Sequence, residues 1–160
     1  MQIQVGIITI SDRASAGDYE DLGGPALKEA AQKAGWQVLS EAIVPDDADS
    51  IQQAVLSFSS QGCGLILTTG GTGVGPRDVT PEAIRAIMRV ELPGFGEVMR
   101  AESMKITPNS ILSRSLAAIV DSSLVIAFPG KPSGAVECLG FVQGAIPHGV
   151  ALAQRVPTSC

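Results

Sequence analysis

The order of apolar and polar positions predicts short buried strands that alternate with amphipathic helices. Continuous aliphatic or β-branched runs, typical of strands buried on both faces, occupy residues 3–10, 37–44, 64–69 and 124–128, and a weaker extended segment covers 115–120. Apolar residues at helical spacing predict helices over residues 25–34, around 51–58, from 80 onward, over 93–105, around 136–142 and after 147. This alternation indicates an α/β fold, so we expect a three-layer sandwich with a mostly parallel sheet flanked by helices.

Capping residues indicate where the predicted helices begin and end. Gly35 is expected to end the first helix, and Thr80 to be the N-cap of a helix whose first position is Pro81. Asp47 or Asp49 is expected to cap the helix around residues 51–58. The segments left between these elements are loops.

Four of those loops are polar or rich in glycine, and each follows a predicted strand. They cover residues 11–17, 45–49, 70–80 and 129–134. In an open parallel sheet the carboxyl ends of the strands share one rim, where ligands bind beside a change in strand order. We therefore expect these four loops, distant in sequence, to form one site.

Composition narrows the class of protein. The 160 residues are 45% hydrophobic and 17% charged, below the roughly 25% charge of soluble domains, which indicates one compact domain over residues 1–160 and excludes a disordered polyelectrolyte. Eleven basic and sixteen acidic residues give 11 − 16 = −5. A nucleic-acid binder normally carries a basic face, so we expect no nucleic-acid partner.

The compartment is expected to be the cytoplasm. No apolar run approaches the roughly 20 residues that cross a bilayer, and the N-terminal apolar run lacks the basic region of a signal peptide. The three cysteines, Cys63, Cys138 and Cys160, are an odd number without a C-x-x-C pair, which favours reduced thiols. We expect no membrane association.

The most informative loop is the glycine run at residues 70–75. Gly70, Gly71, Gly73 and Gly75 lie between a buried strand and a helix, where glycine lets backbone N–H groups face an anion. The spacing fails the Rossmann pattern at Pro76, and no Gly-Lys-Ser/Thr of a Walker A loop follows. The alternative is a glycine-rich turn without a ligand.

Two aspartates and several cations follow the same strands. Asp46 and Asp78 could hold Mg²⁺ beside bound phosphates, although each could instead support a turn. Three basic side chains could neutralise phosphates or instead form local ion pairs: Arg13, Arg77 and Lys131. Three hydroxyl groups could donate hydrogen bonds at the site or instead cap a helix or turn: those of Ser11, Ser15 and Ser133.

Catalysis by a histidine or by a serine nucleophile is disfavoured. His148 lies after Pro147, far along the chain from the glycine loops, and no G-x-S-x-G nucleophile motif occurs. The site therefore combines anion cradles, carboxylates and cations without an evident general base. That combination favours phosphoryl or nucleotidyl transfer, above all to a phosphate nucleophile that is already ionised.

Five ordered motifs resemble one known family. ISDRAS at 10–15, TTGGTGVGPRDVTPEA at 68–83, PGFGEVMR at 93–100, LSRSLAAI at 112–119 and PGKPSGAVECL at 129–139 are similar to the molybdopterin adenylyltransferases of the MogA/MoaB type, which include the G domain of gephyrin-like proteins. The resemblance runs nearly end to end, and the TTGGTG-x-x-x-RDVTPEA segment is highly specific to that family.

The resemblance implies a fold, a reaction and a site. It implies a MogA/MoaB-like α/β fold, a homotrimer, and the Mg²⁺-dependent transfer of AMP from ATP to molybdopterin, with a separate protein for molybdate insertion. It implies a catalytic role for Asp46 and Asp78, which are also the candidate Mg²⁺ ligands. The residues implied to bind substrate or nucleotide are Ser11, Asp12, Arg13, Gly70, Gly71, Thr72, Gly73, Gly75, Pro129, Gly130, Lys131 and Ser133.

Two other functions stay open at this point. Some relatives in the MoaB-like branch lack activity, so the chain could bind molybdopterin or act as a scaffold without catalysis. The presence of RDVTPEA and of both aspartates favours the active branch. A general nucleotide-binding regulator is disfavoured by the failed Rossmann and Walker patterns.

Overall fold

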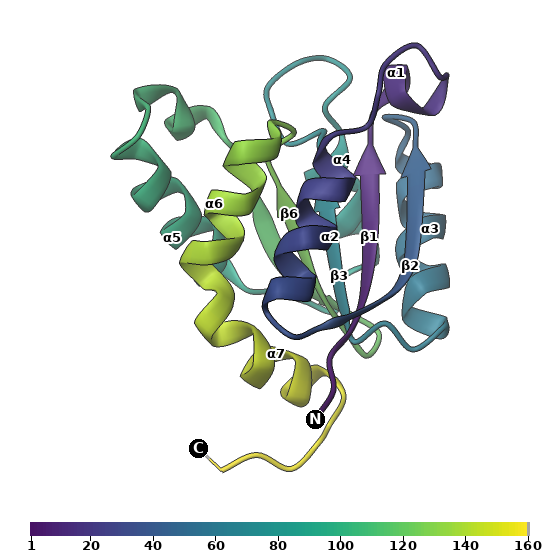
Figure 1. Cartoon of the computed structure of the whole chain (residues 1–160), viewed down its shortest axis with the longest axis vertical. Coiled ribbons are helices and arrows are strands. Elements are labelled where there is room, and N and C mark those ends of the chain that lie inside the picture. The colour runs from purple at the N-terminus through teal and green to yellow at the C-terminus, as the bar shows by residue number, and fades with distance from the viewer. Residues whose placement is uncertain (160) are drawn as a thin grey trace.

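A six-stranded sheet forms the centre of the molecule. The computed structural model describes residues 1–159, so Cys160 lies outside the described residues. The strands run in the order β2-β1-β3-β6-β5-β4 (Figure 1). Their bounds are β1 Gln4–Ile10, β2 Gln37–Val44, β3 Leu65–Thr69, β4 Val90–Glu91, β5 Leu116–Val120 and β6 Ser123–Phe128.

The sheet is mixed, with a parallel main part. β2, β1, β3 and β6 pair in parallel, whereas β5 pairs antiparallel with both β6 and β4. Asp121, with a φ of 49°, lies in the short connection between β5 and β6, where the tight turn needs a left-handed residue. The predicted mostly parallel α/β sandwich is therefore confirmed.

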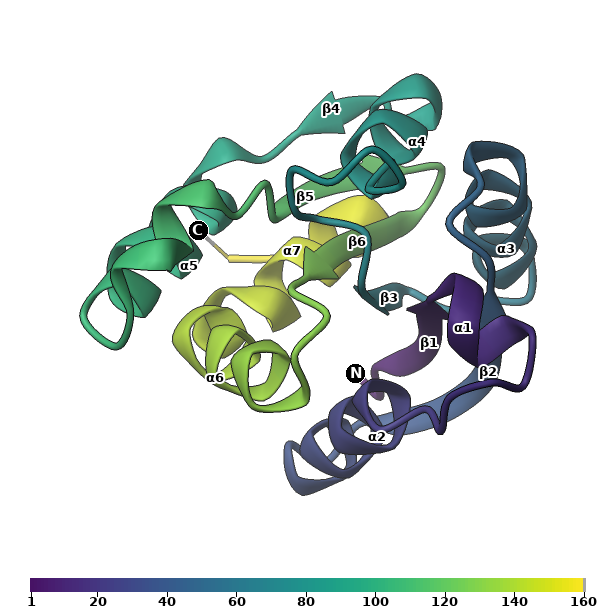
Figure 2. The ribbon, with the colours of Figure 1, turned by 90° about the horizontal axis from the view of Figure 1, so that it is seen from above.

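Helices cover both faces of the sheet. Figure 2 shows α2 and α6 on one side and α3 and α4 on the other. Along the chain the helices are α1 Asp12–Ser15, α2 Gly23–Lys33, α3 Ala48–Ser60, α4 Thr80–Ile87, α5 Pro93–Met104, α6 Pro132–Val142 and α7 Ile146–Ala153, with 3-10 turns η1 Pro108–Leu112 and η2 Gln143–Ala145.

The alternation of side chains along each strand divides the core in two. In β1, Val5 and Ile7 pack with α2, α6 and α7, whereas Ile8 and Ile10 pack against α3 and α4. β3 and β6 divide their side chains in the same way between the two clusters. Because these strands are buried on both faces, they read as continuous aliphatic runs in the sequence.

The strand order changes direction at β1. The chain passes from β1 to β2 on one side and returns to β3 on the other, so β1 and β3 are neighbours at a switch point. Loops that leave neighbouring strands in opposite directions open a crevice between them at the carboxyl rim. Figure 1 shows the loops after β1, β2, β3 and β6 at the same end of the sheet.

Several sequence predictions of elements need correction. Thr80 is not an N-cap: α4 begins at Thr80 after Val79, and the Thr80 hydroxyl donates to the carbonyl oxygen of Gly70 instead. Asp47 caps α3 by accepting from the N–H of Ser50, whereas Asp49 lies within the first turn. The short elements α1, β4 and η1 were not predicted.

The C-terminal helices form one long apolar run. Contrary to the expectation that no apolar run is long enough, residues Pro132–Ala153 are long and apolar enough to cross a bilayer by length and composition. Their side chains Leu139, Val142, Ile146 and Val150 lie in the core against the sheet. His148 belongs to α7, at the end of the molecule opposite the rim (Figure 1).

Candidate active site at the carboxyl rim

Two neighbouring cavities open at the rim. The first, here called the α1 cavity, has a volume of about 430 Å³ and lies between α1, the start of α2 and the loops after β2, β3 and β6. The second, here called the α5 cavity, has a volume of about 540 Å³ and lies between the glycine loop, α5, η1 and the start of α6. Four residues line both cavities and form their junction: Gly71, Asp78, Gly130 and Lys131.

The structure brings most of the predicted site residues to these cavities. The α1 cavity is lined by Ser11, Arg13, Asp46, Gly70 and the four junction residues. The α5 cavity is lined by Thr72, Gly73, Pro129 and Ser133 together with the junction. Asp12 and Gly75 line neither cavity and contribute through their hydrogen bonds.

The carbonyl groups of residues 70–72 in the glycine loop accept hydrogen bonds from Thr80 and Arg114. The buried hydroxyl of Thr80 donates to the carbonyl oxygen of Gly70 at 2.9 Å, and its N–H donates to that of Gly71 at 3.1 Å. The N–H of Arg114 donates to the carbonyl oxygen of Thr72 at 2.8 Å. Three consecutive peptide groups are thereby fixed in orientation.

The N–H groups of residues 71–73 point the other way. All peptide bonds of the described chain are trans, and the C=O and N–H of a trans peptide point in opposite directions. Within residues 1–159, none of these three N–H groups donates a hydrogen bond to a protein acceptor, and all three residues line the α5 cavity. Successive free N–H groups in a loop form an anion-binding concavity, so this segment can hold a phosphate.

Glycine is required where the loop leaves β3. Gly70 and Gly71 have φ angles of 106° and 68°, in the left-handed region. A Cβ at Gly70 would clash with the carbonyl oxygen of Ile10 in β1, and a Cβ at Gly71 would clash with the Thr80 hydroxyl. The close passage of the loop over β1 therefore depends on these two glycines.

Asp46 and Asp78 approach the α1 cavity from different loops. Oδ2 of Asp46 accepts from the N–H of Asp12 at 2.9 Å, and Oδ2 of Asp78 accepts from the N–H of Gly75 at 2.8 Å. Burial raises the pKa of Asp46 above its usual value, and the negative charges of Asp12 and Asp78 add to that effect. Both carboxylates thus belong to residues that line the same cavity.

These carboxylates fit a divalent cation that also touches substrate phosphates. In the described part of the chain, Oδ1 of Asp46 and Oδ1 of Asp78 accept no hydrogen bond from protein. Residues 1–159 contain no group of three or more His, Cys, Asp or Glu side chains placed to hold a metal. Mg²⁺ characteristically uses one or two carboxylates together with water and phosphate oxygens, and this donor set suits it.

Asp12 joins three of the rim loops. Its carboxylate accepts both Nε and Nη2 of Arg77 at 3.0 Å, and Oδ1 also accepts the N–H of Asp46 at 3.0 Å. The Arg77 guanidinium lowers the pKa of Asp12. Arg77 therefore forms the ion pair that was the alternative to phosphate binding, and Asp12 ties together the loops that follow β1, β2 and β3.

Of the three predicted cations, Arg13 and Lys131 line the cavities. Arg13 lies 4.6 Å from the ring centroid of Tyr19, and both residues line the α1 cavity. Lys131, at the N-cap of α6, lines both cavities and forms no ion pair with Glu137 or any other described residue. The α6 N-terminus adds its own partial positive charge beside this lysine, so an anion is favoured at the junction.

Sequence reasoning missed the outer wall of the α5 cavity. Residues from α5, η1 and α6 form it: Met99, Arg100, Ser103, Ile106, Thr107, Asn109, Ser110, Leu112, Ser113, Glu137 and Cys138. The PGFGEVMR and LSRS motifs flank this wall, but residues 105–115 carry no strand or helix period that would have placed them. Burial raises the pKa of the Cys138 thiol, and Ser103 lies 3.4 Å from its sulfur, so this cysteine belongs to the wall as a thiol.

Comparisons with known proteins agree with this geometry. The family model described as "Probable molybdopterin binding domain" matches residues 6–148. Molybdopterin adenylyltransferases of Helicobacter pylori J99 and Escherichia coli K12 are 44% and 40% identical, covering 94% and 92% of this chain and 87% and 80% of those proteins. The molybdopterin biosynthesis enzyme MoaB of Thermus thermophilus has a TM-score of 0.91 at 36% identity, covering 99% of this chain and all of that one. The resemblance in the motifs is therefore confirmed, and the chain belongs to the molybdopterin adenylyltransferase family.

Proposed function

We propose that this protein transfers AMP from ATP to the terminal phosphate of molybdopterin, giving adenylyl-molybdopterin and pyrophosphate. One observation carries the proposal: Asp78 lies at the junction of two cavities, beside Asp46 and a row of free backbone N–H groups. Two cavities that share an anion cradle suit two phosphate-bearing substrates that meet at their phosphates. Relatives at 40–44% identity are named for this activity.

The chemistry needs little from a general base. A molybdopterin phosphate oxygen attacks the α-phosphorus of ATP; the new P–O bond forms as the bond from the α-phosphorus to the bridging oxygen breaks, and pyrophosphate leaves with that electron pair. The attacking phosphate is already ionised at neutral pH, so positioning and charge stabilisation supply the catalysis. This requirement matches a site rich in cations and N–H donors.

Individual roles follow from the positions of the residues. The free N–H groups of residues 71–73, with Lys131 and the α6 N-terminus, hold substrate phosphates. Asp46 and Asp78 would hold Mg²⁺, which when bound would neutralise charge on the α-phosphate of the transferred adenylyl group. Ser11 and Arg13 line the α1 cavity, whereas residues 129–133 contribute to the walls of both cavities.

Product analysis tests the activity directly. Purified protein incubated with ATP, Mg²⁺ and molybdopterin should release pyrophosphate, and mass spectrometry should detect a pterin heavier by one adenylyl group. The same mixture without molybdopterin should release no pyrophosphate. Pterin binding without product would overturn the proposal.

A second candidate function is molybdopterin binding without catalysis. It is favoured by the matched family model, whose description names molybdopterin binding and no catalysis. This function predicts tight pterin binding that is unaffected by ATP and by Asp78 substitutions. The product assay separates it from the transferase.

We also propose a cytoplasmic homotrimer that passes its product to a separate molybdate-insertion protein, without a nucleic-acid or membrane partner. Apolar side chains that are 44–63% exposed at Met104, Ile106, Ile111 and Leu112 support a buried subunit face. Light scattering at micromolar concentration should give three times the chain mass. A monomer mass would contradict the assembly.

A further inference from the structure

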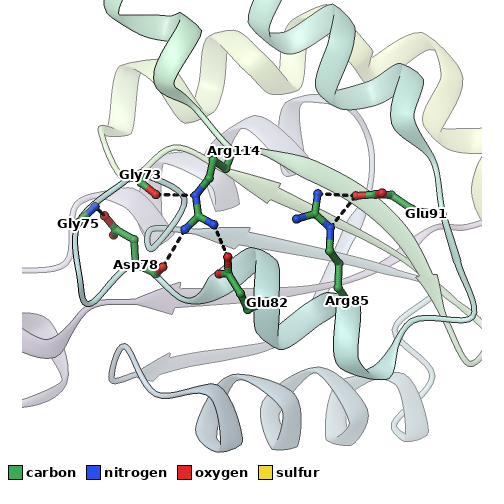
Figure 3. A network of polar contacts seen from close by, with 7 residues as sticks. All are labelled: Gly73, Gly75, Asp78, Glu82, Arg85, Glu91 and Arg114. Atoms are coloured by element: carbon green, nitrogen blue, oxygen red, sulfur yellow. Dashed lines mark hydrogen bonds and ion pairs between the residues drawn. The ribbon is translucent and has the colours of Figure 1, made fainter.

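Arg114 lies behind the glycine loop and contacts it at two separated points. Its Nε donates to the carbonyl oxygen of Gly73 and its Nη2 to that of Asp78, both at 2.8 Å, and Nη1 pairs with Glu82 in α4 (Figure 3). The segment from Gly73 to Asp78 is therefore held at both ends by one guanidinium.

The same loop segment is closed from within. The N–H of Asp78 donates to the carbonyl oxygen of Gly75 at 3.0 Å, and the N–H of Gly75 donates back to the Asp78 carboxylate. These two bonds fix the Asp78 side chain relative to its own turn, but they do not fix the turn relative to the sheet. The Arg114 bonds supply that second restraint, because Arg114 directly precedes β5 through Ser115.

Arg114 does not face the substrates. The lining of the α5 cavity includes its neighbour Ser113 but not Arg114, whose three named donor atoms all point at loop carbonyls or at Glu82. A planar guanidinium can bridge two carbonyl oxygens in a fixed geometry, which a lysine ammonium cannot reproduce. Its contacts therefore suit holding the loop rather than binding a ligand.

We infer that Arg114 is a positioning residue for AMP transfer, which places the Asp78 carboxylate and the N–H groups of the glycine loop through its bonds to Gly73 and Asp78. This inference rests on the proposed role of Asp78. It assigns a function to the arginine of the LSRS motif, which lies far along the chain from the loop it holds.

Two residues give matched controls. Arg85 of α4 forms a comparable ion pair with Glu91 of β4, at 2.9 Å, but bonds to no glycine-loop carbonyl (Figure 3). Arg85→Ala removes the same charge and leaves the loop untouched. Glu82→Gln removes the ion pair of Arg114 while leaving its two carbonyl bonds.

The test compares these variants with Arg114→Ala and Arg114→Lys. Arg114→Ala should lower kcat about 10- to 100-fold, since a displacement of about 1 Å can cost about 100-fold. Arg114→Lys should recover little, whereas added millimolar guanidinium should restore part of the Arg114→Ala rate, because the side chain lies at a partly open site. Arg85→Ala and Glu82→Gln should stay within about twofold of the wild type, and guanidinium should not activate them.

A second measurement does not depend on activity. Amide exchange of Gly75, Asp78 and Thr80, whose N–H groups bond within the loop, should accelerate in Arg114→Lys and Arg114→Ala but not in Arg85→Ala. If the wild type transfers no AMP, the proposed function is wrong, but the amide exchange rates still test whether Arg114 holds the glycine loop. Wild-type turnover or wild-type exchange in the Arg114 variants would overturn the inference.

Discussion

Asp12 and Asp46 hold each other through a reciprocal pair of hydrogen bonds. The N–H of Asp12 donates to Oδ2 of Asp46 at 2.9 Å, and the N–H of Asp46 donates to Oδ1 of Asp12 at 3.0 Å. The two residues follow β1 and β2, which are neighbouring parallel strands, so the bonds join two loops at the rim. Each carboxylate accepts from a backbone N–H, which lets two acidic side chains lie close together despite their charges.

Asp12 should therefore matter for transfer without contacting substrate. Asp12→Ala removes the partner of Arg77 and of the Asp46 N–H, and AMP transfer should fall about 10- to 100-fold as Asp46 shifts. The midpoint of thermal unfolding should change little, because the ion pair with Arg77 is exposed. Steady-state kinetics and thermal melts measure both effects.

The control for Asp12 is an exposed acidic residue away from the rim site. Glu41 lies on β2, lines neither cavity and pairs with Lys28 of α2, so Glu41→Ala removes only that ion pair. It should leave kcat and KM unchanged. An Asp12→Ala enzyme as active as Glu41→Ala would show that the reciprocal bonds do not position Asp46.

The raised pKa of Asp46 predicts an unusual dependence of stability on pH. A carboxyl group whose folded pKa lies above its unfolded value of 3.8 disfavours folding once it is ionised, so its destabilising effect grows as pH rises through the folded pKa. Asp46→Asn keeps an acceptor for the Asp12 N–H and removes the charge. The variant should melt higher than the wild type at pH 7, and the difference should vanish as pH falls below 3.8.

This prediction is tested by measuring the melting temperature of Asp46→Asn and of the wild type at several pH values, together with AMP transfer at pH 7. The same Asp46→Asn protein should have lost AMP transfer at pH 7, so stability and function would change in opposite directions. A melting difference that is the same at acid and neutral pH would mean that the Asp46 charge does not cause it.

The part of the site that could be predicted from the sequence is the part that the parallel strands bring to one rim. Strands buried on both faces leave aliphatic runs, and parallel strands place their following loops at one rim, so the convergence of Asp46 with Gly70 and Lys131 followed from pattern alone. The identity of a pterin substrate did not follow from any pattern of this kind. It came from motif resemblance.

The rest depends on contacts between residues far apart in sequence. Thr80 matched an N-cap signal, but its hydroxyl bonds to Gly70 because the loop folds back over the start of α4. Arg114 reaches the loop from 36 and 41 positions away. A local spacing rule cannot register either contact, because each exists only after the chain has folded.

Thr80→Val should destabilise the fold through a single lost bond. Valine matches the shape of threonine, so the substitution leaves the buried carbonyl oxygen of Gly70 without its hydroxyl donor. The free energy of unfolding should fall by about 1–3 kcal/mol, as measured by urea denaturation. Thr80→Ser keeps the hydroxyl and should lose about 1 kcal/mol from the missing methyl group; equal losses in both variants would assign the effect to packing.

Asp78 offers the sharpest separation of charge from loop geometry. Asp78→Asn keeps an oxygen that can accept from the Gly75 N–H but removes the negative charge, whereas Asp78→Ala removes both. AMP transfer should fall about 10²- to 10³-fold in both variants, since the site would lose a carboxylate that would hold Mg²⁺ against the substrate phosphates. Most pterin binding and the fold should survive, as fluorescence titration and circular dichroism would show.

The control is Asp49→Asn, which removes an exposed carboxylate from the first turn of α3 and should match the wild type in AMP transfer. Full turnover by Asp78→Asn would remove the carboxylate from the reaction and leave Asp78 as a loop-forming residue alone.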